Sequence, residues 1–229
     1  VTPANGAPLL RYVTGQSFTG TPMVVFTPDV RQGAVQILFD DGQSCSYHFA
    51  LDSGFSVRTE RRIPTGLSVL AGTGSDTGVL YLIDQSGQLA LVPVDPNGTV
   101  RSNRAVLLEG LSADHAAGWT MTAGPDTLAI AAASPAVAVT VSLGDLTDAS
   151  TVAVHPVFSA SVWLLFPSTV PNPPSFTCPV RLNDQVVWFI ADAEGNTLFC
   201  LRFTGEKPSI EPITFSPPPT GAIDRLMVT

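Results

Sequence analysis

Apolar residues along the chain occur in short runs in which they often alternate with polar residues, and turn-forming residues separate the runs. A period of two is typical of β-strands, whereas the 3.6-residue period of an amphipathic helix is almost absent here. The pattern predicts an all-β fold, and only 114–119 has a weak helical pattern. The main predicted strands lie in segments 22–28, 34–51, 77–94, 127–143, 161–168 and 185–203.

Asp and Gly stand between two apolar runs at FDDGQS (39–44), IDQSGQ (83–88) and ADAEGN (191–196), which predicts three β-hairpins. We interpret Asp40 and Asp41 as residues of the first of these turns and not as a metal site. The Gly-rich stretch AGTGSDTG (71–78) is not followed by a helix whose N-terminus could bind phosphate, so we expect a flexible loop there.

Composition divides the chain into a middle region and two flanks. Region 58–149 is richer in Ala, Gly, Thr and Ser than its flanks and poor in Phe, which predicts a subdomain separate from 1–57 and 150–229. Because Pro lacks a backbone N–H, the Pro-rich passage 167–179 is expected along a surface or at a sheet edge. A second Pro-rich passage, 215–221, is expected to be polyproline-like and solvated.

The charge balance excludes some classes of partner. Lys and Arg total 11 against 19 Asp and Glu, which gives a net charge of −8, and no basic run is present. Such a chain repels phosphate backbones, so we expect no nucleic-acid binding. Apolar runs stay well short of the 18 or so residues of a membrane span, so we expect no membrane insertion but a soluble fragment of a longer polypeptide. Cys45, Cys178 and Cys200 are odd in number and far apart, which favours buried free thiols over a disulfide framework.

The stretch ALDSGFS (50–56) has the Asp-Ser-Gly of an aspartic protease, and SDTGVL (75–80) offers a second Asp-Thr-Gly. Such enzymes bring two carboxylates together from two lobes or two subunits. Asp52 and Asp76 are too close in sequence to come from two full lobes, and the chain is too long for the single-motif dimeric type. We therefore favour the interpretation that both stretches are turns, and the protease is a remote alternative.

No other catalytic or metal-binding set is found in the sequence. His48, His115 and His155 are far apart, and none has the spacing of a zinc-binding pair. A nucleophile elbow, a phosphate-binding loop and a dinucleotide fingerprint are absent as well. We therefore predict no catalytic residues, no metal ligands, no cofactor and no enzymatic activity.

Loop residues offer a weaker signal for ligand binding. Asp114, His115 and Trp119 could give a sugar a carboxylate, a hydrogen-bond donor and a stacking face. The alternative is that Trp119 anchors its loop into the core. Asn97-Gly98-Thr99 also has the form of a glycosylation site.

Three segments, in the same order, resemble the protruding domain of calicivirus capsid proteins, most closely that of noroviruses. In 26–45, Pro-Asp leads through an apolar strand to an Asp-Gly turn and a cysteine. In 159–180, a strand of Val, Leu and Phe precedes a Pro-rich passage that ends at a cysteine, and 183–203 is similar to a hairpin with a cysteine inside its second strand. All three cysteines fall on cysteine positions of that pattern. The chain departs from it in having a short middle region and a short segment after Cys178.

The resemblance implies a discontinuous β-rich subdomain, 1–57 and 150–229, close to the capsid shell, with a small antiparallel β-barrel, 58–149, inserted at the outer surface. It places ALDSGFS at the hinge between the two. It implies a spike that forms homodimers on the virion surface after assembly in the host cytoplasm, attaches to a host-cell glycan or protein receptor, and is exposed to neutralising antibodies. Within that barrel we expect five loop residues near any ligand: Asp76, Asn97, Asp114, His115 and Trp119.

A non-viral all-β module that binds carbohydrate or protein, such as a lectin or part of a propeller, is the alternative function. The repeated unit of strand, Asp/Gly turn and strand at IDQSGQ and ADAEGN supports it. The two units lie about 109 residues apart, which differs from the roughly 40-residue repeat of a propeller blade and argues against a propeller.

Overall fold

The computed structural model describes residues 23–26, 34–39, 45–51, 57–64, 67–75, 78–95, 100–113, 118–133, 136–172, 174, 176–192 and 197–214. Most of these residues lie in β-strands, so the all-β prediction is confirmed. The described strands form four sheets, which we number in chain order. Sheet 1 contains β1 (Met23–Phe26), β2 (Ala34–Phe39), β3 (Cys45–Leu51) and β4 (Val57–Pro64).

The remaining three sheets follow along the chain. Sheet 2 contains β5 (Ser68–Ser75), β6 (Gly78–Gln85), β7 (Gln88–Val94), β8 (Val106–Ser112) and β12 (Thr151–Ala153). Sheet 3 contains β9 (Thr120–Ala123), β10 (Thr127–Ala133), β11 (Ala136–Ser142) and β13 (His155–Pro156). Sheet 4 contains β14 (Thr177–Leu182), β15 (Gln185–Ala191), β16 (Thr197–Thr204) and β17 (Lys207–Thr214).

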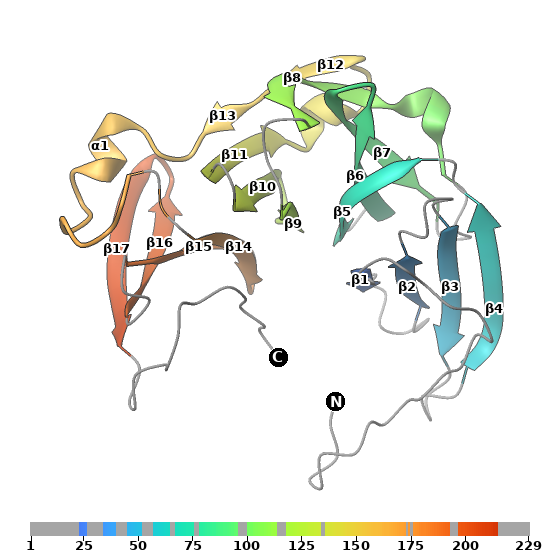
Figure 1. Ribbon diagram of the computed structural model, residues 1–229, viewed down its shortest axis with the longest axis horizontal. Coiled ribbons are helices and arrows are strands. Elements are labelled where there is room, and N and C mark those ends of the chain that lie inside the picture. The colour runs from blue at the N-terminus through green and yellow to red at the C-terminus, as the bar shows by residue number, and fades with distance from the viewer. Residues whose placement is uncertain are drawn as a thin grey trace, which may run out of the picture.

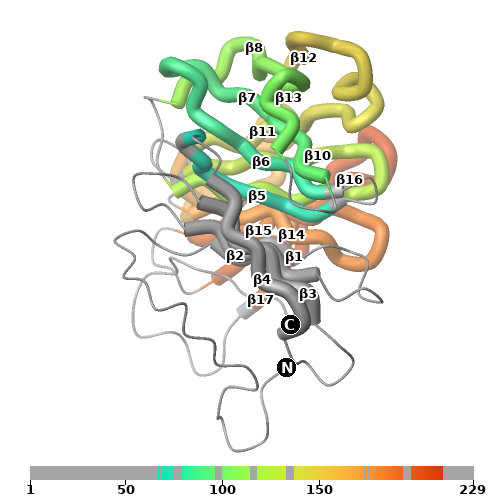
Figure 2. Tube along the Cα trace, turned by 90° about the vertical axis from the view of Figure 1, so that its right-hand side faces the viewer, coloured from blue at the N-terminus to red at the C-terminus, as the bar shows by residue number. Residues whose placement is uncertain are grey.

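Each sheet is an antiparallel meander whose strands pair in sequence order, and only β12 adds in parallel, beside β8. The four sheets succeed one another along an arc, with the first strands β1, β5, β9 and β14 on its inner side (Figure 1). Neighbouring first strands contact each other along this inner side. Figure 2 views the arc from its side, where β5, β6, β7 and β8 follow one another outward across sheet 2.

Successive sheets recur at a regular interval along the sequence. Their first strands begin at Met23, Ser68, Thr120 and Thr177, so the sheets begin 45, 52 and 57 residues apart. Four-stranded meanders repeated side by side around a centre are the blades of a β-propeller, and the arc has the arrangement of consecutive blades. IDQSGQ joins the second and third strands of sheet 2, and ADAEGN joins those of sheet 4. Their spacing spans two sheets, so the argument that it made against a propeller is wrong.

Both faces of a sheet are apolar in this arrangement. In β10, Leu128 and Ile130 pack toward sheet 2, whereas Ala129 and Ala131 pack toward sheet 4. In β15, alternate residues from Trp188 pack toward sheet 3 and those from Val187 pack on the opposite face. A strand that is buried on both faces has little polar alternation, which explains the near-continuous apolar runs of the sequence. Because such sheets stack face to face, neither face is left to line the inside of a barrel.

The predicted barrel in 58–149 is accordingly wrong. The described strands of this region belong to two open sheets, 2 and 3, and the following residues extend those sheets through β12 and β13. Strand β4 crosses the predicted boundary at 57/58 and pairs with β3. Within the described residues no strand ladder joins sheet 1 to sheet 4, the sheets that the two flanks form. The division into shell-proximal and outer subdomains stays a prediction.

The stretch 71–75 is part of strand β5, so the expectation of a loop there was wrong; 76–77 lie outside the described residues. Its small residues suit the crowded inner side of the arc, where a glycine permits close backbone approach. The Thr73 hydroxyl accepts a hydrogen bond from the Ala123 N–H of β9 at 3.2 Å. From β9, the Thr122 hydroxyl donates to the Pro179 carbonyl of β14 at 2.9 Å. These two bonds connect the first strands of sheets 2, 3 and 4.

Segment 161–168 differs from its prediction as a strand. It contains the end of a short helix, α1 (Ala160–Trp163), and the turns that follow. The Ser159 hydroxyl caps this helix by accepting the Val162 N–H at 3.4 Å. The Phe158 and Trp163 rings stack with centroids 4.9 Å apart, so the aromatic residues gather in a local cluster rather than along a strand. Pro179 lies in β14, an edge strand of sheet 4, which confirms the edge position expected for the end of 167–179.

The hairpin predicted at IDQSGQ is confirmed. Ser86 and Gly87 both have positive φ, 57° and 88°, as a two-residue type I′ turn requires. The Asp84 carboxylate accepts the Gly87 N–H at 2.7 Å, which fixes the turn from within. The hairpins predicted around FDDGQS and ADAEGN are present as β2–β3 and β15–β16.

Candidate functional site

The residues predicted to lie near a ligand are not brought together by the described part of the structure. Asp76, Asn97, Asp114 and His115 lie outside the described residues, as does Asp52 of the protease alternative. Trp119 is 9% exposed and belongs to the core cluster between sheets 2 and 3. Its burial agrees with the alternative that this ring anchors its loop into the core.

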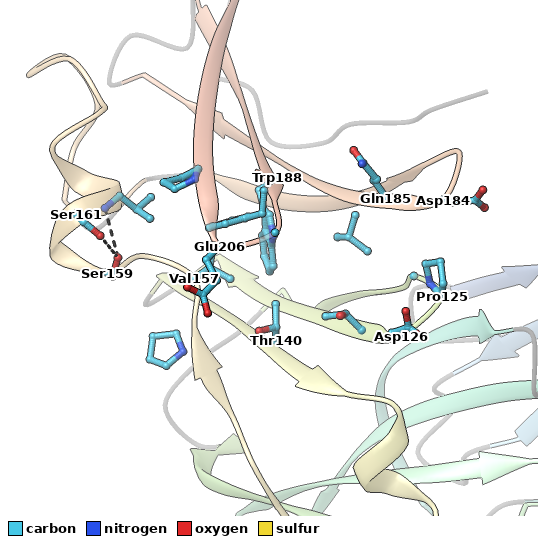
Figure 3. Close-up of a pocket in the computed structure, with 18 residues that line it drawn as sticks. Pro125, Asp126, Thr140, Val157, Ser159, Ser161, Asp184, Gln185, Trp188 and Glu206 are labelled. Atoms are coloured by element: carbon cyan, nitrogen blue, oxygen red, sulfur yellow. Dashed lines mark hydrogen bonds between the residues drawn. The ribbon is translucent and has the colours of Figure 1, made fainter.

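A cleft of about 500 Å³ lies between sheets 3 and 4 and is shown in Figure 3. Three turns contribute to it: β9–β10 of sheet 3, and β14–β15 and β16–β17 of sheet 4. The segment from β13 into α1 lines its other end. In a meander, the turn after the first strand and the turn after the third strand lie at the same end of the sheet. The topology therefore places both turns of sheet 4 at one end of that sheet.

Local sequence fixes the shape of these turns. Gly124 donates its N–H to the Thr127 carbonyl at 2.8 Å, and a Cβ added at Gly124 would lie 2.9 Å from the Val186 Cγ2 of β15. Glycine thus lets the β9–β10 turn approach sheet 4. Asn183 and Gly205 have φ of 55° and 61° in the two turns of sheet 4, a conformation that Asn and Gly adopt at low cost.

The floor of the cleft is apolar and tightly packed. Val157, Val162 and Trp188 line it and also belong to the cluster that holds sheets 3 and 4 together. Trp188 is only 2% exposed, so its ring is covered by neighbouring side chains. The cleft therefore has a rigid base but no exposed tryptophan face on which a sugar ring could stack.

The rim of the cleft is acidic. Asp126, Asp184 and Glu206 each lie on one of its three turns and are exposed, and no Lys or Arg lines the cleft. The Asp184 side chain is 89% exposed and lies 3.6 Å from the Arg181 guanidinium, a contact that water screens strongly. Asp126 and Glu206 have no side-chain partner among the described residues. Three carboxylates at one opening create a local negative potential that attracts cations.

Hydroxyl groups occupy the opposite end. Ser159 and Ser161, at the start of α1, lie with their oxygens 2.9 Å apart. Thr140 of β11 donates its hydroxyl to the His155 carbonyl at 3.4 Å. These groups can donate or accept hydrogen bonds with a bound ligand, but their side chains contain no base that would activate them as nucleophiles.

The thiols of sheet 4 have structural surroundings. Cys178 and Cys200 are free and lie opposite Phe189 on the two strands that flank β15. Burial raises the pKa of the Cys178 thiol, which keeps it in the protonated, less nucleophilic form at neutral pH. The prediction of free thiols is confirmed for these two residues, and the Cys45 side chain lies outside the described set. Among the described residues, no three His, Cys, Asp or Glu side chains form a group that could hold a metal ion.

Sequence reasoning missed the acidic rim. GPDT (124–127), LNDQ (182–185) and TGEK (204–207) each combine an acidic residue with turn residues between two strands, and each alone is an ordinary turn. The available signal was their position in the meander, since all three follow the first or third strand of a sheet. Reading that signal requires the repeat of sheets to be recognised first.

Comparison with known proteins leaves the chain without an assigned family. No protein-family model matches it, and neither a curated protein nor a solved structure is significantly similar to it. Within the described residues, none of the helices has the length and apolar character that crossing a membrane requires.

Proposed function

We propose that the protein is a non-enzymatic binding module and that the cleft between sheets 3 and 4 receives part of its ligand. The observation that carries this proposal is a cleft with an apolar floor and polar groups around its rim. Its volume of about 500 Å³ lies within the range of about 300–1,000 Å³ that is usual for ligand sites.

The surrounding structure supports a preformed site. Sheets 3 and 4 are held together by a shared cluster that contains Ile190, Phe199 and Leu201. The hydrogen bond from Thr122 to Pro179 joins their first strands. Turns that are carried on fixed sheets lose little freedom when a ligand binds, and this preorganisation favours affinity.

Substituting Gln185→Trp is expected to weaken ligand binding by about tenfold or more, because an indole at the rim would occupy the cleft. Gln185 is exposed at the first position of β15 and lines the cleft. The experiment applies labelled protein to arrays of glycans and of displayed peptides. Gln88→Trp is the matched control, because Gln88 is exposed at the first position of β7 and does not line the cleft. Equal binding by the Gln185→Trp and wild-type proteins on every ligand found would contradict the proposal.

A capsid spike is the second candidate function, and the three-segment sequence resemblance favours it. It adds a homodimer, a host-cell glycan or protein receptor, neutralising antibodies and a place on the virion surface to the first proposal. Cys200 lies inside the second strand of the β15–β16 hairpin, which is consistent with the third segment. The strand expected in the second segment is replaced by α1, and this departs from the pattern.

The spike hypothesis predicts a dimer in solution. Light scattering across micromolar concentrations is expected to give twice the 24.0 kDa of one chain. A monomer mass at every concentration would remove the dimer from the hypothesis. It would leave the binding module as the proposed function, because the cleft lies within one chain.

A further inference from the structure

We propose that the cleft recognises a protein partner through a segment that carries Lys or Arg side chains. This inference rests on the proposed function, since it names the class of ligand for the same cleft. Its first support is charge: the rim presents three exposed carboxylates and no basic residue. A cationic side chain that enters the cleft meets complementary potential from each of the three turns.

The carboxylates are spaced along the cleft rather than gathered at one point. In Figure 3, Asp126 and Asp184 lie toward one end, Glu206 lies near Trp188 and Val157, and Ser159 and Ser161 lie at the other end. An extended segment can place one basic side chain near the aspartates and a second near Glu206. Its remaining polar groups can then hydrogen-bond with the serine hydroxyls.

The apolar surroundings favour a protein over a sugar. The Trp188 ring is covered, so it offers no stacking face to a sugar ring. At the other side of α1, whose first residues line the cleft, Leu164 is 85% and Leu165 is 45% exposed. Exposed large apolar side chains beside a polar cleft are typical of a protein interface, where they pack into the partner's surface.

The test measures fluorescence anisotropy of a labelled peptide in which Arg alternates with Ser, with a peptide in which Gln replaces Arg as the neutral probe. The Arg peptide is expected to bind the wild-type protein and the neutral peptide is not. In the double variant Asp126→Asn with Glu206→Gln, binding is expected to weaken about tenfold, because each exposed ion pair contributes roughly two- to fivefold. Raising the salt concentration is expected to weaken wild-type binding and to have little effect on the double variant.

The matched control is Asp145→Asn with Glu109→Gln, which removes the same two kinds of carboxylate from exposed positions outside the cleft. It is expected to bind the Arg peptide within about twofold of wild type, as distant surface charges are screened. Equal weakening by both double variants would show attraction to net charge alone and overturn the proposal.

Failure of the inference can be separated from failure of the proposed function. If glycans bind the wild type and are lost in Gln185→Trp while the Arg peptide never binds, the cleft is a ligand site and the basic partner is wrong. If Gln185→Trp keeps all binding, both are wrong. Loss of Arg-peptide binding in Gln185→Trp, with retention in Gln88→Trp, would support both.

Discussion

The variant Trp188→Ala is expected to lower the free energy of unfolding by about 3–5 kcal/mol, the usual cost of truncating a buried tryptophan. Trp188 is 2% exposed, lies between Pro179 and Leu201 on the flanking strands, and packs in the cluster shared by sheets 3 and 4. Removing the ring loses its burial and leaves a cavity that the stacked sheets cannot readily fill. Urea unfolding curves measure the change, and an unchanged slope would show that the same surface unfolds.

Trp163→Ala is the control for this variant. Trp163 is half-buried on α1 and stacks on Phe158 at the margin of the same cluster. Its truncation is expected to cost about 1–2 kcal/mol, because fewer contacts are lost and solvent fills the gap. If both variants cost the same, Trp188 would not be the centre of the packing between the two sheets.

Local strand pairing was largely predictable from the sequence. Alternating apolar residues around an Asp/Gly turn specify a hairpin through a few neighbouring residues, and Ser86 and Gly87 adopt the turn that their types allow. The helix α1 was missed because its apolar residues look like a strand when their packing is unknown. The hydroxyl cap of Ser159 and the stacking of Phe158 on Trp163 decide for a short helix.

The repeat of sheets was not predictable from the same pattern. The first strands share no common motif, as SVLAGTGS in β5, TMTA in β9 and TCPVRL in β14 show. What they share is position: each lies at the inner side of the arc and touches the next. Such contacts between residues far apart in sequence depend on how sheets stack, which strand patterns do not encode.

The candidate site shows the same limit. The cleft joins Asp126 of sheet 3 to Asp184 and Glu206 of sheet 4, which are separated by up to 80 residues of sequence. Each acidic turn is unremarkable by itself, and only the packing of two sheets places the three around one opening. Sequence analysis instead selected residues with conspicuous chemistry, and Trp119, the one of them that is described, lies in the core.

The variant Ala131→Leu is expected to destabilise the protein by about 1–3 kcal/mol, because a larger side chain does not fit between two closely stacked sheets. Ala131 is fully buried in β10, opposite Ala138 of β11, and both side chains pack toward sheet 4. These small residues leave room for the larger Trp188 and Phe199 of the facing sheet. Urea unfolding again gives the change in free energy.

Ala153→Leu is the matched control, since Ala153 is exposed on β12 and its substitution is expected to change stability by no more than about 0.5 kcal/mol. The comparison tests the stacking itself rather than strand propensity, because both positions lie in β-strands. If Leu is tolerated equally at both positions, sheets 3 and 4 cannot be packed face to face. The cleft would then lose the rigid base on which the proposed binding depends.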